Sequence, residues 1–210
     1  MATPAQLMET ISAATGTPLA TVIDIDRKLT KAGLRTKGGR GFSAASMTPK
    51  DAAHLLTAML AAPQSNEAVL AVGRYSQTCV DEERSSDRLF GVAALDDLSE
   101  LSALHDFITG LSIVIDSAIA GGLFRLRQTI GSGSTPHIEV FAFTSATRGR
   151  IRISNLPNRM TASVEYFPIG GASIAPLGST GDLEQSRRIT ERTIFSIADI
   201  LGQEGCRERS

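Results

Sequence analysis

The spacing of apolar residues changes once along this chain, near the two glycines at 121–122. Before that point apolar residues recur every three or four positions, as at Val22, Ile25 and Leu29, and this spacing predicts amphipathic helices. Beyond it, residues 150–154 alternate strictly between polar and apolar side chains, which predicts a half-buried strand. Helices followed by strands along one chain predict an α+β fold.

Three helices are predicted in the first 62 residues. They cover 4–14, 18–32 and the residues from 49 onwards. Thr17 is a favourable N-cap for the second helix, Pro18 suits its first position, and Gly33 stands where a left-handed C-cap residue is expected. Thr48 and Asp51 have the spacing of a capping box at the start of the third helix.

The rest of the chain is predicted to hold a long helix, a small sheet and a final helix. The long helix, within 98–120, has apolar residues at alternating spacings of three and four: Leu101, Leu104, Ile108, Leu111 and Ile115. This pattern suits a seam between two helices, so we expect either self-association through this helix or its burial within one domain. The sheet, expected to be antiparallel, occupies roughly 123–176, and the final helix covers about 182–201.

Composition and charge suggest three regions. These are a helical domain over 1–62, an acidic linker or helical region over 63–97, and an α+β domain for self-association or regulation over 98–210. An apolar content of 42% is sufficient for an ordinary core. No apolar run approaches the roughly 20 residues that span a bilayer, and no secretory signal pattern begins the chain, so we expect a cytoplasmic protein without membrane contact.

The residue types that usually carry catalysis or bind metals are sparse. His54, His105 and His137 have no histidine, cysteine or acidic partner at metal-ligand spacing. Cys79 and Cys206 are far apart, which is typical of reduced thiols in a cytoplasmic protein. The sequence therefore predicts no enzymatic activity, no cofactor and no metal site.

Seven basic residues and no acidic residue lie between positions 27 and 50. They are Arg27, Lys28, Lys31, Arg35, Lys37, Arg40 and Lys50. With four acidic residues elsewhere in 1–62, this region has a net charge of +3 (seven minus four), whereas the whole chain carries −1. Such a local concentration of positive charge indicates contact with a polyanion such as duplex DNA.

The turn between the first two helices gives a second indication. Its glycine, Gly16, is preceded four residues earlier by the small Ser12 and followed six and nine residues later by Val22 and Ile25. A small residue lets two helices cross closely, glycine permits a left-handed turn, and the aliphatic residues lock the second helix. Residues 4–33 thus resemble the helix-turn-helix DNA-binding family, with serine at position 12 instead of the commoner alanine.

The resemblance implies that the N-terminal part of the second helix enters the major groove, where Thr17 and Thr21 approach base edges or phosphates. The loop over 37–41 offers a second contact, because a glycine-flanked arginine such as Arg40 suits a narrow minor groove. The predicted DNA-binding residues are Thr17, Thr21, Arg27, Lys28, Lys31, Arg35, Lys37 and Arg40.

Three functions are consistent with this pattern. The first is a sequence-specific transcriptional regulator that binds double-stranded DNA as a homo-oligomer. The second is a DNA-packaging subunit that forms a ring, because the order of elements resembles that of phage small terminase subunits. The third is an interaction module whose basic patch binds an acidic protein rather than DNA.

Overall fold

The structure is a computed structural model that describes residues 2–37, 45–86, 98, 101, 103–123, 137–144, 146–156, 160–169 and 185–202. Its helices are α1 (Pro4–Thr15), α2 (Leu19–Lys31), α3 (Pro49–Ala61), the short η2 (Ser65–Glu67), α4 (Ala68–Tyr75), α6 (Phe107–Ile119) and α8 (Glu191–Gly202). Its strands are β1 (Thr78–Val80), β2 (His137–Phe143), β3 (Gly149–Leu156), β4 (Met160–Pro168) and β5 (Ser186–Thr190). The protein therefore has an α+β fold, as the change in apolar spacing predicts.

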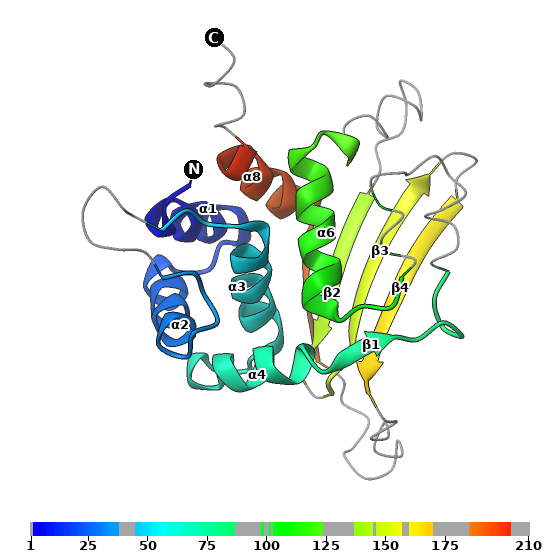
Figure 1. Ribbon diagram of the computed structural model, residues 1–210, viewed down its shortest axis with the longest axis horizontal. Coiled ribbons are helices and arrows are strands. Elements are labelled where there is room, and N and C mark those ends of the chain that lie inside the picture. The colour runs from blue at the N-terminus through cyan, green and yellow to red at the C-terminus, as the bar shows by residue number, and fades with distance from the viewer. Residues whose placement is uncertain are drawn as a thin grey trace.

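The five strands form one antiparallel sheet in the order β1-β4-β3-β2-β5. The three central strands lie within the predicted range of 123–176, but both edge strands come from outside it. In Figure 1 the helices gather on one side of the sheet, with α2 farthest from the strands. Among the described helices, none is long and apolar enough to cross a membrane.

One hydrophobic core joins the helices to the sheet. Strands β2, β3 and β4 direct alternate apolar side chains, such as Val140, Ile151 and Val164, towards the helices, and all three are fully buried. Helix α3 packs against α2, α4, α6, β2 and β5, while α1 packs against α8. The same core cluster includes Leu7 of α1 and Ile197 of α8, so it extends through both ends of the described chain.

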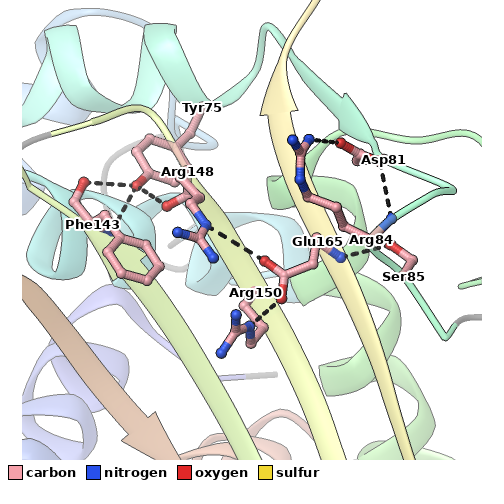
Figure 2. Close-up of polar contacts among 8 residues, drawn as sticks. All are labelled: Tyr75, Asp81, Arg84, Ser85, Phe143, Arg148, Arg150 and Glu165. Carbon is pink, nitrogen blue, oxygen red and sulfur yellow. Dashed lines mark hydrogen bonds and ion pairs between the residues drawn. The ribbon is translucent and has the colours of Figure 1, made fainter. Parts of the chain in front are cut away.

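Tyr75 at the end of α4 fastens the helices to the turn between β2 and β3 (Figure 2). Its buried hydroxyl lies 2.7 Å from the carbonyl oxygen of Arg148 and 2.9 Å from that of Phe143, and it accepts the Phe143 N–H at 3.0 Å. Burial raises the pKa of Tyr75 to about 12. Its ring meets the edge of the Phe107 ring, whose other contact is Tyr166. A polar and an aromatic contact thus join α4, α6 and the sheet at one point.

The predicted long helix is shorter than the apolar spacing suggests. Asp106 is the N-cap of α6, because its side chain accepts the Thr109 N–H at 2.8 Å, so the helix begins at Phe107. Leu104 lies outside the helix and is exposed. Ile108, Leu111 and other apolar residues of α6 are buried against this chain's own α3, α8 and strands. Burial within the fold, the second expectation for this helix, is confirmed for these side chains.

The predicted final helix is wrong in its first half. Residues Ser186–Thr190 form edge strand β5, and α8 begins only at Glu191. Arg187 explains part of the difference, because its guanidinium donates to the carbonyl oxygens of Met59 at 2.9 Å and Ala62 at 2.7 Å. These acceptors belong to the C-terminal end of α3, where a cation is favourable. The spacing of apolar residues within 182–201 does not predict this contact with residues far away in the sequence.

We predict that Tyr75→Phe lowers the free energy of unfolding by roughly 1–3 kcal/mol, because it removes the buried hydroxyl that bridges Phe143 and Arg148. Urea denaturation followed by circular dichroism measures the change. The control Ser76→Ala removes an exposed hydroxyl that bonds only within its own helix turn, and it should cost less than about 0.5 kcal/mol. Equal losses in the two variants would contradict the bridging role.

Candidate nucleic-acid interface

The turn between α1 and α2 has the geometry that its sequence predicts. Gly16 adopts a left-handed conformation with φ 72° and ψ 8°. A Cβ added at this glycine would meet no atom within 4 Å, so the backbone angle, rather than lack of space, favours glycine. Ser12 contributes more than small size, because its hydroxyl donates to the Thr17 carbonyl at 2.7 Å. Ser12 thus fastens the turn to α1. The family resemblance requires only a small residue at this position and does not predict this hydrogen bond.

The predicted N-cap of α2 is wrong by one position. The helix begins at Leu19, and Pro18 with extended backbone angles is the N-cap residue, without a side-chain hydrogen bond. The Pro18 carbonyl oxygen accepts the first N–H groups of the helix, those of Thr21 at 2.9 Å and Val22 at 3.2 Å. The Thr17 hydroxyl lies 3.0 Å from that of Thr15 instead, in a partly buried position.

The outward face of α2 carries the basic residues. Val22, Ile25 and Leu29 are buried in the core, as their spacing predicts. The exposed described residues on the opposite face are Ala20, Arg27 and Lys31, and Thr21 is exposed at the edge of that face. Because Ala20, Arg27 and Lys31 are seven and four positions apart, they form one continuous stripe along the helix. The stripe begins with a small side chain and ends with two cations.

Lys28 lies beside this stripe but has partners within the chain. Its ammonium group forms an ion pair with Asp24, one helical turn earlier, and donates to the Ser65 hydroxyl at 3.0 Å. The hydrogen bond from Lys28 is the main cause that lowers the pKa of Asp24, and the hydrogen bond from Ser65 lowers it further. The Asp24 carboxylate is therefore ionised at neutral pH. Lys28 therefore links α2 to η2, and its charge is offset by Asp24.

Arg35 turns inward. Gly33, with φ 77°, reverses the chain after α2, so the Arg35 guanidinium reaches back to Asp26 at 2.8 Å and to the Thr30 hydroxyl at 2.7 Å. Only 13% of the Arg35 side chain and 7% of the Asp26 side chain are exposed. Burial raises the pKa of Asp26, and the charge of Arg35 opposes this rise. These contacts give Arg35 a structural role at the end of α2.

Asp51 holds the two ends of the basic loop together. One of its carboxylate oxygens accepts the Thr36 N–H at 2.7 Å, and the other accepts the Thr48 N–H at 2.9 Å. The predicted capping box with Thr48 is confirmed, while the bond to Thr36 could not be predicted from local spacing. Burial by itself would raise the pKa of Asp51, but these hydrogen bonds outweigh it and lower the pKa. Asp51 thus ties Thr36 to Thr48, on either side of the predicted basic loop.

The loop is only partly described. Lys37 is exposed at its start, whereas Arg40 and residues 38–44 lie outside the described residues. Lys50 is exposed in the first turn of α3. Of the eight predicted DNA-binding residues, the structure thus places Thr21, Arg27, Lys31 and Lys37 on the surface with Thr17 partly buried, while Lys28 and Arg35 have internal partners.

No protein-family model matches the chain, and neither a curated protein nor a solved structure matches it. Within the described ranges, no three histidine, cysteine or acidic side chains converge as metal ligands would. Cys79 is a free thiol, and Cys206 lies outside the described residues.

We predict that Asp51→Asn destabilises the protein at neutral pH by roughly 1–3 kcal/mol, because an amide replaces one acceptor oxygen with a donor facing an N–H group. Because the pKa of Asp51 is lowered in the folded protein, its carboxylate stabilises the fold above pH 3.8, the pKa of the unfolded chain. This stabilisation is lost as the pH falls through the pKa of the folded protein. The difference between wild type and variant should therefore narrow below pH 3.8.

Urea denaturation at a series of pH values between neutral and strongly acidic measures this difference. Glu82→Gln is the matched control, because Glu82 is exposed in the turn after β1. A difference between wild type and Asp51→Asn that stays constant through the acid range would contradict an ionised Asp51 as the clamp of the loop.

Proposed function

We propose that this protein binds double-stranded DNA through the outward face of α2 and the adjacent basic loop. The observation that carries the proposal is the continuous exposed stripe on α2, in which Ala20, Arg27 and Lys31 lie opposite the buried Val22 and Leu29. A helix fixed by one apolar face presents the other face rigidly, as recognition of a groove requires.

The stripe supports a division of roles along α2. Ala20 and Thr21 are small, so they allow the first turns of the helix to approach base edges closely. Arg27 and Lys31, at the far end, contact phosphates and set the strength of binding rather than its sequence preference. The tethered turn at Gly16 and Thr17 holds the first turns of α2 in position for this contact.

The loop supplies the second contact. Lys37, which follows Thr36 at the start of the loop, is exposed. We assign the nearby Arg40 to the minor groove, as its flanking glycines predict. We leave Arg35 out of the interface because its guanidinium pairs with the buried Asp26, and we give Lys28 a supporting role because Asp24 offsets its charge. The interface thus consists of Thr17, Thr21, Arg27, Lys31, Lys37 and Arg40.

We further propose that the DNA-binding protein is a sequence-specific transcriptional regulator. A packaging ring of the small-terminase kind needs a helical oligomerisation surface, and α6 was the candidate in the sequence. Most of the apolar residues of α6, including Ile108, Leu111 and Ile115, are buried within the chain, which favours the regulator over the ring. Self-association to read an inverted repeat would then use a surface other than the buried face of α6.

We predict that the double variant Arg27→Gln/Lys31→Gln binds duplex DNA at least about tenfold more weakly at about 0.1 M salt. Because two phosphate contacts are lost, the slope of log affinity against log salt should fall by about 2. Both side chains are exposed, so the thermal midpoint should stay within about 2 °C of the wild type. Fluorescence anisotropy with a labelled random-sequence duplex measures the binding.

The matched control is Arg74→Gln/Arg192→Gln, which removes two exposed cations from α4 and α8 instead of α2. Its affinity and salt slope should remain near those of the wild type. Absence of duplex binding at low salt would overturn the proposal, as would an equal loss in the control. Gel filtration with light scattering separates a dimeric regulator from a large packaging ring.

A further inference from the structure

The sheet has a second face that points away from the helices. On β2, Ile138, Val140 and Ala142 are buried towards the helices, so Glu139 and Phe141 project to the opposite side. The same alternation places Arg150 and Arg152 of β3, Glu165 of β4 and Arg188 of β5 on this side. We call these residues, with Arg148 and Phe143 at the β2–β3 turn, the arginine face.

Two carboxylates lie at the centre of two groups of arginines on this face. Glu139 on β2 forms ion pairs with Arg188 on β5 at 2.6 Å and with Arg152 on β3 at 3.7 Å. Glu165 on β4 is paired with Arg150 and, at 3.6 Å, with Arg148. Figure 2 shows the second group, in which both arginines point towards Glu165 from the neighbouring strand and turn.

The two carboxylates of the arginine face are buried, whereas its arginine side chains are partly exposed to solvent. The side chains of Glu139 and Glu165 are 10% and 6% exposed, whereas those of the four arginines are 28–52% exposed. Four positive and two negative charges give the face a net charge of +2. Each guanidinium has roughly five N–H donors and each carboxylate roughly four acceptor sites, so donors exceed acceptors. The surface offered to solvent is therefore suited to an anion.

Aromatic rings alternate with these cations. Phe141 is partly exposed and is paired in register with Arg150 on one side and Arg188 on the other. The Arg188 guanidinium lies 6.0 Å from the centre of the Phe141 ring. Arg148 lies over Phe143 at 4.8 Å, so a second guanidinium is stacked on a ring. Planar guanidinium groups and aromatic rings are the groups that stack with nucleobases.

We propose that the arginine face binds single-stranded nucleic acid. The arginines contact the phosphates, and unpaired bases stack on Phe141 and on the exposed guanidinium planes. An acidic peptide would use the cations but not the ring, and duplex DNA keeps its bases stacked within the helix. The combination of charge and ring therefore favours an unpaired strand as the occupant.

This surface is separate from the proposed duplex interface. Helix α3 packs between α2 and the sheet, and α2 lies farthest from the strands in Figure 1. The residues of the arginine face point away from all the helices that α2 contacts. The two proposals can therefore be tested independently. Absence of duplex binding through α2 would not contradict the arginine face, and absence of single-strand binding would not contradict α2.

The test uses the full chain and a fluorescein-labelled oligonucleotide of about 15 deoxythymidines, with binding measured by anisotropy at low salt. We expect binding that is weakened at least about threefold by Arg188→Gln and by Phe141→Leu. The exposed control Arg192→Gln, on α8, should leave this binding within about twofold.

Unlabelled poly-glutamate of equal charge serves as the competitor that separates stacking from charge alone. We expect it to displace the oligonucleotide poorly, because it has no bases. Absence of oligonucleotide binding overturns the proposal, and so does equal competition by poly-glutamate together with an unchanged affinity in Phe141→Leu. If circular dichroism shows that Phe141→Leu is unfolded, Arg188→Gln decides, because its side chain is 52% exposed.

Discussion

The structure depends on the burial of α3 on all sides. Nine of its thirteen residues are buried, and they include the small Ala52, Ala53, Ala58 and Ala61. Small side chains allow α2, α4, α6 and two strands to approach the same helix closely. Replacing such an alanine with a larger residue would therefore strain several elements at once. Through α3, the helix-turn-helix segment and the sheet share one core.

This shared core explains how the two surfaces are held. Asp51 of α3 accepts hydrogen bonds from Thr36 and Thr48, on either side of the basic loop, and α2 packs on the same helix. On the other side, Arg187 of β5 donates to the carbonyl end of α3, and Tyr75 fastens α4 to the β2–β3 turn. The proposed duplex interface and the arginine face are thus positioned by opposite sides of one helical layer.

Local spacing predicts the helical segments well because their determinants are close in sequence. Gly16, the capping box at Thr48 and the buried face of α2 each depend on residues within about nine positions. The edge strands escape such prediction because β1 has only three residues and β5 is polar, so neither has an apolar pattern of its own. Their strand conformation is determined by pairing with distant strands.

The candidate sites are likewise predictable only where the residues that determine them are close in sequence. The outward stripe of α2 is predictable because a helix with one buried face must expose the other. The inward turn of Arg35 to Asp26 is not, because it depends on the chain reversal at Gly33 and on burial. Likewise the arginine face requires the register that sets Glu139 opposite Arg152 and Glu165 opposite Arg150. Alternation in one strand predicts exposed arginines there, but it does not predict which carboxylates pair with them.

The most direct measurement of the central claim is backbone amide NMR of the full chain during titration with duplex DNA. Contact through α2 predicts that the largest shift changes fall on residues 19–31 and on Lys37, with little change in β2 to β5. Changes confined to the sheet, or none at low salt, would contradict α2 as the duplex-binding element.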